Sequence, residues 1–257
     1  MKRIVTAISV VLLTGCSAMS DMHDEVKGMT AEQMYQEAKS DLEGGNLTRA
    51  IQMYEKLEAR YPYGRYAQQA QLEIAYAHHK DGDAALALAA CDRFIKMHPT
   101  HPHVDYAFYL KGLVNFIDDA GFMSFISQQD MTERDPRSAR ESYEAFHELV
   151  QRFPASRYAA DARKRMAYLI NALAANEIHV ARYYLTRGAP LAAANRAQLV
   201  LSAYPTSPEA EEALAIMVQA YDQLNLPALR DDAKRVLDTN YPGSAYLQPR
   251  KTSFWRW

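Results

Sequence analysis

The chain has few of the residues that break helices or build covalent frameworks. Its 257 residues include two cysteines, ten glycines and eleven prolines. Two cysteines exclude a disulfide-rich scaffold, and this little glycine and proline excludes a collagen-like or low-complexity chain. Hydrophobic residues make up 49% of the sequence, which is enough to fill a core. Alanine, leucine, glutamate, glutamine and arginine dominate the interior of the chain and favour helix.

Basic charge is not in excess either. The chain carries 29 lysines and arginines against 31 aspartates and glutamates, a formal net charge of −2 at pH 7. A protein that binds nucleic acid normally shows a basic stripe. We therefore expect no nucleic-acid partner.

Motifs that carry catalysis are absent from the sequence. It contains no GxGxxG, Walker loop, HExxH, GxSxG, CxxC or SxxK. The best metal candidate is the histidine phrase HPTHPH, in which His98, His101 and His103 lie close together. The phrase contains no carboxylate or cysteine, so we favour a structural role over zinc binding. We predict neither an enzyme nor a metal site.

The N-terminus reads as a signal peptide over residues 1–15. Lys2 and Arg3 precede an apolar stretch from Ile4 to Leu13, which is too short to span a bilayer as a helix. The following sequence LTGC resembles a bacterial lipobox. This resemblance implies a diacylglycerol and an N-acyl chain such as palmitate on Cys16, with no other cofactor. The alternative is a fortuitous cysteine after an ordinary signal.

The residue after the lipobox cysteine bears on localisation. Ser17, not aspartate, follows Cys16, which in enteric-type sorting indicates the outer membrane. No second apolar stretch reaches membrane-spanning length. Acylation of Cys16 leaves Cys91 without a disulfide partner, and we expect Cys91 to be a buried structural thiol.

One short phrase recurs five times along the chain. Its copies are RYPYGRYA at 60–67, HPTH at 98–101, RFPASRYA at 152–159, YPTS at 204–207 and NYPGSAY at 240–246. Proline disfavours the helical conformation of the residue before it, and the small or polar pair after it caps the next helix. The phrase is thus a helix stop followed by a helix start, and its recurrence predicts a repeat protein.

Residues at fixed distances before each of these prolines share one helix face. Those five positions before are all apolar, and those eight and twelve positions before are mostly small or aromatic. This pattern resembles the second half of the tetratricopeptide repeat (TPR). We predict an all-α, right-handed superhelix of about five TPR-like helix-turn-helix units. The three sets are Leu57, Phe94, Leu149, Val200 and Leu237; Tyr54, Cys91, Phe146, Ala197 and Lys234; and Ala50, Ala87, Ser142, Ala193 and Arg230.

The repeat pattern divides the chain further. Thr30 begins the folded body with a capping box completed by Gln33. The stretch from Ser156 to Leu173 reads as an additional helix before the fourth repeat. The loop at 118–135 either folds back on its own repeat, which we favour, or forms a lid that contacts a partner. The predicted segments are a tether at 16–29, an N-terminal TPR lobe at 30–117, the inserted loop at 118–135, a C-terminal TPR lobe at 136–245 and a tail at 246–257.

Tyrosines mark the candidate substrate site. The first helices of TPR units line a groove in which peptide segments dock. On this frame Tyr35 and Tyr76 face the groove, while Tyr61 and Tyr63 flank the first helix stop at its mouth. We expect these four residues to contact substrate. A core position is the alternative for Tyr61.

Four longer stretches carry a family resemblance, and the THP-DY-YLKGL and YY-RGA-AA-NR strings within them are more specific than a generic TPR. They resemble the BamD (ComL) family, the essential lipoproteins of the outer-membrane β-barrel assembly machine of Gram-negative bacteria. The resemblance implies a non-enzymatic scaffold and receptor, anchored by lipid in the outer membrane and facing the periplasm. The stretches are RYPYGRYAQQAQLEIAYAHHKDGD, DRFIKMHPTHPHVDYAFYLKGL, RDPRSARESYEAF with RFPASRYAADARKRMAYL, and VARYYLTRGAPLAAANR.

The same resemblance implies partners and contact residues. N-terminal repeats of the family receive the C-terminal signals of unfolded outer-membrane proteins. C-terminal repeats dock the periplasmic domain of the barrel-forming subunit, BamA, and a BamC-like lipoprotein lies along the body. Arg196 matches the family's docking arginine, while Tyr183 and Arg187 match positions implicated in substrate or partner contact. The alternative for Arg196 is a solvated helix face.

Two other functions stay open at this point. The first is a periplasmic TPR lipoprotein that scaffolds cell-wall or envelope-transport enzymes. The second, with little support, is an envelope hydrolase or metalloprotein that uses the histidine phrase.

Overall fold

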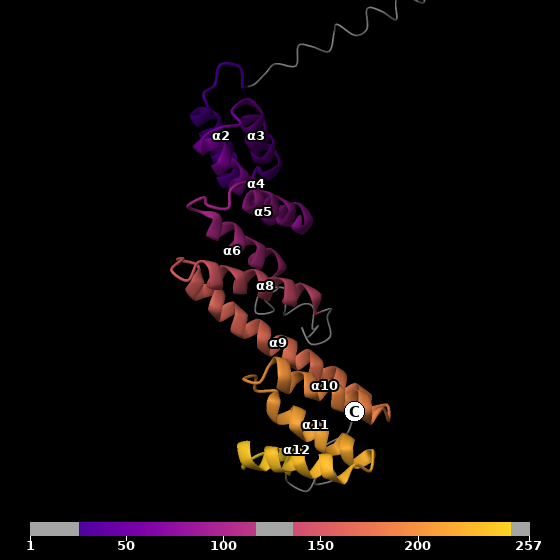
Figure 1. Ribbon diagram of the computed structural model, residues 1–257. Coiled ribbons are helices and arrows are strands. Elements are labelled where there is room, and N and C mark those ends of the chain that lie inside the picture. The colour runs from indigo at the N-terminus through magenta and orange to yellow at the C-terminus, as the bar shows by residue number, and fades with distance from the viewer. Residues whose placement is uncertain (1–25, 117–135, 248–257) are drawn as a thin grey trace, which may run out of the picture. The chain divides into compact units, whose positions relative to one another are not determined.

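The computed structural model describes residues 26–116 and 136–247 of the chain (Figure 1). Cys16, the signal peptide, the inserted loop at 118–135 and most of the tail therefore lie outside the described residues. Within the described ranges there are ten α-helices and no strands. The prediction of an all-α, TPR-like fold is confirmed. None of these helices combines the length and the apolar character needed to cross a membrane.

The chain forms two compact units, Met1–Asp83 and Ala84–Trp257. The sequence placed the boundary between lobes at the insert, and that position is corrected. The insert joins α6 (Val104–Asn115) to α8 (Arg137–Arg152), and these two helices pack directly on each other. It therefore interrupts a helical hairpin and does not separate two lobes.

The first unit contains α2 (Ala31–Glu43), α3 (Leu47–Arg60) and α4 (Arg65–Asp81), which pack on one another. The predicted capping box starts α2, because the N–H of Gln33 donates to Thr30 Oγ1 and the N–H of Thr30 donates to Gln33 Oε1 (3.2 and 2.8 Å). Gly82 ends α4 with a left-handed φ of 81°, a conformation that glycine adopts without strain. The largest fully buried side chains of this core are Tyr54, Met34, Met53 and Leu57.

In the second unit each helix packs on the one that follows it along the chain. The longest, α9, has 28 residues without a break and contacts α8, α10 and α11. The prediction of a separate helix at 156–173 is therefore wrong, because no proline or glycine interrupts α9. The helices of this unit are α5 (Ala84–Met97), α6, α8, α9 (Ala159–Thr186), α10 (Pro190–Ala203), α11 (Ala210–Gln223) and α12 (Pro227–Asn240), followed by a short 3₁₀ turn, η2 (Ala245–Leu247).

The recurring proline phrase has the predicted geometry. The residue before each of four prolines adopts φ between −128° and −132°, outside the helical region. Its N–H still donates to the carbonyl four residues earlier at 2.8 Å, which closes the last helical turn. In three copies a serine two residues after the proline then accepts the N–H that starts the next element. The residues before proline are Tyr61, Phe153, Tyr204 and Tyr241, and the serines are Ser156, Ser207 and Ser244.

The predicted core positions are buried in every repeat except the last. The apolar residues five positions before each proline are at most 2% exposed. In α12, however, the residues eight and twelve positions before the proline are Lys234 and Arg230, and neither is buried. Terminal repeats of a solenoid need a polar outer face, so these two residues suit the end of the repeat array.

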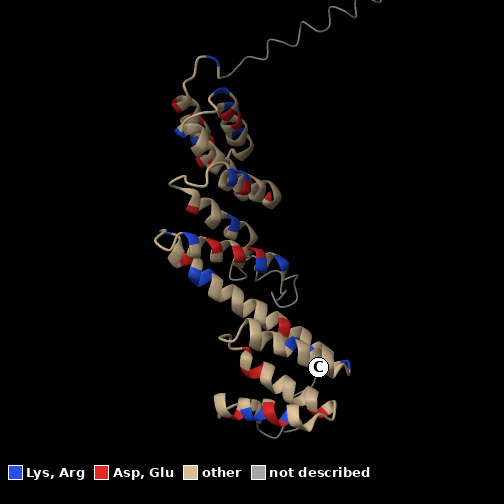
Figure 2. Ribbon diagram, viewed as in Figure 1, with Lys and Arg blue, Asp and Glu red and all other residues tan. Residues whose placement is uncertain are grey.

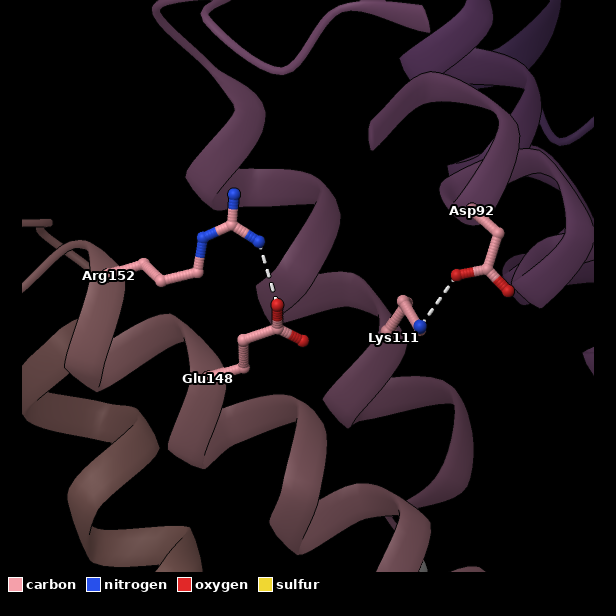
Figure 3. Close-up of polar contacts among 4 residues, drawn as sticks. All are labelled: Asp92, Lys111, Glu148 and Arg152. Carbon is pink, nitrogen blue, oxygen red and sulfur yellow. Dashed lines mark hydrogen bonds and ion pairs between the residues drawn. The ribbon is translucent and has the colours of Figure 1, made fainter. Parts of the chain in front are cut away.

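Side-chain contacts also join neighbouring helices of the second unit (Figure 3). Lys111 of α6 pairs with Asp92 of α5 (2.6 Å), and Arg152 of α8 pairs with Glu148 on its own helix (2.7 Å). The guanidinium of Arg152 also lies over the ring of Phe108 in α6, 4.8 Å from its centroid. Exposed ion pairs stabilise little. Of the contacts in this paragraph, the one between Arg152 and the buried ring of Phe108 links α6 to α8.

A glycine permits the closest approach of α6 and α8. Gly112 lies beneath the ring of Phe146, and a Cβ built at Gly112 would be 2.3 Å from Phe146 Cε1. The carbonyl of Gly112 also accepts a hydrogen bond from Ser142 Oγ (2.8 Å). The small residue at this position therefore sets the distance between the two helices.

We predict that Gly112→Ala destabilises the second unit by about 1–3 kcal/mol, since the added methyl group overlaps a buried ring. Urea unfolding of the full chain, followed by circular dichroism, measures the change. Gly243→Ala is the control: its Cβ meets nothing within 4 Å, so the expected change is within about 0.5 kcal/mol. Equal stabilities of Gly112→Ala and wild type would contradict the close packing of α6 on α8.

Candidate functional site

Helix α10 differs from the other second helices of the repeats in its charge. Arg196 is its only charged residue, whereas α8 and α12 each carry several acids and bases. Figure 2 shows this contrast in the ribbon, where α12 is banded in red and blue and α10 is mostly tan. An amphipathic surface helix normally places charged residues on its outer face, so α10 is atypical.

The outer face of α10 is uncharged and partly apolar. Leu191 and Leu199 are 59% and 39% exposed, and they are separated by eight residues, so they lie on one side of the helix. Exposed leucines on an uncharged helix face are typical of a surface that a partner covers. We call this surface the α10 face; its residues are Leu191, Asn195, Gln198, Leu199 and Ser202, all exposed.

Arg196 leaves this helix toward the core. Its Nη1 donates to Oε2 of Glu177 in α9 (2.8 Å), and Glu177 is only 2% exposed. Oε1 of the same carboxylate lies 3.6 Å from Nη2 of Arg140 in α8. The hydrogen bond to Glu177 is the main reason that the pKa of Arg196 is raised. Arg196 is therefore paired with a buried carboxylate while part of its side chain stays exposed, and we call Glu177, Arg196 and Arg140 the Glu177 cluster.

The other two predicted contact residues lie at the end of α9, next to the turn into α10. The guanidinium of Arg187 lies over the ring of Tyr183, 5.2 Å from its centroid, and both side chains are exposed. The ring of Tyr184 is 6.0 Å from that of Tyr183. Tyr183 and Arg187 thus contact each other, whereas Arg196 is held by Glu177.

A second arginine–glutamate pair joins α9 to α11. Arg182 donates both Nε and Nη2 to the carboxylate of Glu212, and the hydroxyl of Tyr246 donates to Glu212 Oε2 (2.8 Å). Burial opposes ionisation of Glu212, but the hydrogen bonds from Arg182 and Tyr246 outweigh it and lower the pKa of Glu212. This pair fastens the turn after α12 to the body of the unit.

Sequence reasoning missed Glu177 and Glu212. Glu177 carried one usable signal: it is a lone acid in an apolar stretch of α9, between the buried residues Ala174 and Ile178. Buried carboxylates need a cationic partner, so its position pointed to an arginine elsewhere in the fold. Which arginine pairs with it depends on helix packing, which the sequence pattern does not specify.

The N-terminal tyrosines are placed differently from one another. Tyr35 is 4% exposed, packs beside Tyr54 and Tyr66, and donates its hydroxyl to Glu73 (3.1 Å). Its expected position facing a groove is therefore corrected, because α4 packs on α2 and helps to cover that side. Burial raises the pKa of Glu73, although the bond from Tyr35 acts in the opposite direction.

The remaining tyrosines differ in access to solvent. Tyr61 is half-buried and donates its hydroxyl to the carbonyl of Met29 (2.7 Å), which fits the core alternative. Tyr76 is half-buried, while Tyr63 is 94% exposed. Substrate binding at these positions stays a prediction. Of the four tyrosines, Tyr63 has the most exposed side chain.

The histidine phrase forms a local turn. The ring of His101 meets Phe94 edge-on at 5.2 Å, and its Nδ1 accepts the N–H of His103 (3.1 Å). Burial, together with the neighbouring His103 and His98, lowers the pKa of His101. In the part of the chain that the structure describes, no three His, Cys, Asp or Glu residues are grouped to hold a metal ion. Cys91 is buried, and burial raises the pKa of its thiol to about 12.

Paired helices packed in sequence define a TPR-like repeat protein, and comparison with known proteins gives its family. Residues 27–248 match the family model YfiO, described as outer membrane lipoprotein. The chain is 47% identical to the outer membrane protein assembly factor BamD of Neisseria meningitidis serogroup B, over 100% of this chain and 98% of that protein. It is 39% identical to the protein of the same name from Xylella fastidiosa, over 94% of this chain and 82% of the relative. The chain belongs to the BamD family of outer membrane lipoproteins.

Solved structures are more distant. A kinesin light chain with nearly identical TPR-like repeats, from Podosopora anserina, aligns over 81% of this chain and 94% of its own with 12% identity and a TM-score of 0.34. That score supports no further argument, and the fold rests on the helices themselves.

Two neighbouring tyrosines allow a test of the structural role of Tyr35. The hydroxyl of Tyr54 is buried and has no hydrogen-bond partner among the described residues, whereas that of Tyr35 bonds Glu73. We predict that Tyr35→Phe destabilises α2–α4 by about 0.5–1.5 kcal/mol. Tyr54→Phe removes an unsatisfied buried group, so it is expected to be neutral or stabilising. Amide hydrogen exchange in residues 31–81 measures both changes, and a stabilising Tyr35→Phe would contradict the assignment.

Proposed function

We propose that the chain is a non-enzymatic scaffold and receptor of the outer-membrane β-barrel assembly machine. Membership of a family whose relatives are named outer membrane protein assembly factors supports this role. The observation that carries it is the α10 face, an uncharged helix surface with two exposed leucines beside Arg196. A scaffold needs such a surface and needs no catalytic residues.

The docking partner in this proposal is the periplasmic domain of the barrel-forming subunit, BamA. Interfaces bury apolar residues at their centre and exclude most charge from it. Leu191 and Leu199 supply the apolar contact, while Tyr183, Arg187 and Arg196 supply the aromatic and arginine side chains that dominate binding energy at many interfaces. A BamC-like lipoprotein along the body is a second expected partner.

The first unit is proposed to receive the C-terminal signals of unfolded outer-membrane proteins. Tyr63 stands between Pro62 and Gly64, just before α4, and its side chain is 94% exposed. An exposed tyrosine offers apolar area and one hydrogen bond at low entropic cost. Tyr76, on α4, is half-buried. Tyr35 and Tyr61 instead form hydrogen bonds within the first unit, to Glu73 and to the carbonyl of Met29.

Anchorage completes the proposal. A lipid-modified Cys16 would hold the folded body at the periplasmic surface of the outer membrane, since more than one acyl chain is needed for stable anchoring. Cys16 and the lipobox lie outside the described residues, so this step rests on the sequence and on the family's description as outer membrane lipoproteins.

We predict that Leu199→Glu weakens docking of the full chain to the isolated periplasmic domain of the barrel-forming subunit at least about tenfold, because a charge is then buried in the interface. Isothermal titration calorimetry measures the affinity. Val236→Glu is a matched control: Val236 stands six residues before Pro242, as Leu199 stands six before Pro205, and is 38% exposed. We expect this control to stay within about twofold of wild type.

The outcome of that titration also separates the candidate functions. No binding by the wild-type chain would remove the proposed docking. Copurification with cell-wall synthases in place of barrel-assembly components would then favour the alternative scaffold. Equal losses for Leu199→Glu and Val236→Glu would show that the α10 face is not the docking surface.

We predict that Cys16→Ala releases the protein from the outer-membrane fraction and leaves its helices intact, because the lipids have no other attachment site. Membrane fractionation with immunodetection measures the distribution, and circular dichroism checks the fold. Cys91→Ala is the control, since Cys91 is buried in α5 and is expected to leave anchoring unchanged. A Cys16→Ala protein that still fractionates with the outer membrane would contradict the lipobox.

A further inference from the structure

Glu177 occupies an unusual place for an acid. It is 2% exposed and lies on the side of α9 that contributes Ala174, Ile178 and Ala181 to the core. A carboxylate is costly to bury unless charged partners compensate it. The structure supplies two partners from two other helices, Arg196 of α10 and Arg140 of α8. The fold therefore retains a charge where an apolar residue of similar size would pack more simply.

The bond to Glu177 has a consequence for Arg196. An arginine on a helix surface samples many rotamers, and a partner that binds it must suppress them. Here Nη1 is fixed at 2.8 Å from Glu177 Oε2, while 42% of the Arg196 side chain stays exposed. A guanidinium carries five N–H donors, so the bond to Glu177 leaves other N–H donors for a partner. Arg196 is thus both held in place and reachable from solvent.

We propose that Glu177 is a positioning residue for docking: it never touches the partner, but it fixes Arg196 in the orientation that the partner's oxygen acceptor meets. This inference rests on the proposed function, because it assumes that the α10 surface is where the barrel-forming subunit docks. Arg140 is the supporting cation of the same cluster. It lies 3.6 Å from the second oxygen of Glu177 and links α8 to α9.

The geometry separates Glu177 from Glu212, a half-buried acid of the same unit. Glu212 is also bonded to an arginine, Arg182, and its side chain is 14% exposed. That pair joins α9 to α11 and does not involve Arg196. Removal of Glu212 therefore breaks an ion pair between helices of the same unit without removing the bond between Glu177 and Arg196.

A double-mutant cycle tests the proposal. The full chain and its Glu177→Gln, Arg196→Gln and doubly substituted forms are titrated against the isolated periplasmic domain of the barrel-forming subunit. We expect Glu177→Gln to weaken docking about five- to tenfold when Arg196 is present and less than about twofold when Arg196 is already glutamine, because its effect acts through that arginine. Arg140→Gln is expected to have a smaller effect than Glu177→Gln.

A purely structural role of Glu177 gives a different result. Glu177→Gln would then weaken docking by the same factor in both backgrounds, as we expect for the Glu212→Gln comparison, and the proposal would be overturned. Glu177→Asp retains the charge but withdraws the carboxylate by one methylene group. It covers the case in which Glu177→Gln fails to fold, and its expected affinity lies between wild type and Glu177→Gln.

The two proposals fail in distinguishable ways. Absence of binding by the wild-type chain would remove the docking function and the role of Glu177 with it. Wild-type binding with additive effects of Glu177→Gln and Arg196→Gln would keep the docking function and overturn only the positioning role.

Discussion

Each second helix of this protein ends at a proline, and the rest of the fold depends on that constraint. The residue before the proline is held near φ −130°, yet its N–H still closes the last helical turn. The apolar residue five positions before the proline is then buried in every repeat. Because the same turn recurs, α6, α9 and α11 each start five residues after the proline, although α4 starts three residues after it. Arginine lies over tyrosine 4.7 Å away both at Arg65–Tyr66 and at Arg157–Tyr158, which follow two of these turns.

Features that depend on local pattern could be predicted from the sequence. Helix ends, the capping box at Thr30 and the buried positions within second helices follow from proline, cap chemistry and periodicity, and they are present except at two positions of α12. Features that depend on contacts between helices could not. Tyr35 has a groove-facing position in a generic TPR, but its hydroxyl meets Glu73, 38 residues away. The division predicted at 118–135 differs from the observed one at Asp83 and Ala84 for the same reason, because the repeat period does not specify which helices pack into one unit.

The residues of the candidate site likewise differ in whether the sequence could predict them. Arg196, Tyr183 and Arg187 were found only because a family resemblance named them, and the exposed leucines of α10 follow from the unusual lack of charge in that helix. Glu177, the acid that holds Arg196, was not predicted, because it is 19 residues away on another helix. A single glutamate on an apolar helix face indicates that a cation lies near it. Helix packing, and not sequence spacing, decides that the cations are Arg196 and Arg140.

Burial of Glu177 also determines how the docking surface must be probed. Reversal of charge at Arg196 would set two carboxylates against each other in a site with little access to water, so loss of binding would not separate docking from folding. The leucines of the α10 face have no such second role, because their side chains are exposed and Arg196 is the only charge on their helix. The surface thus combines an apolar part that costs little to desolvate with one charge whose desolvation Glu177 already offsets in part. In the proposed docking, a partner therefore gains a fixed hydrogen-bond donor and does not have to neutralise a fully solvated arginine.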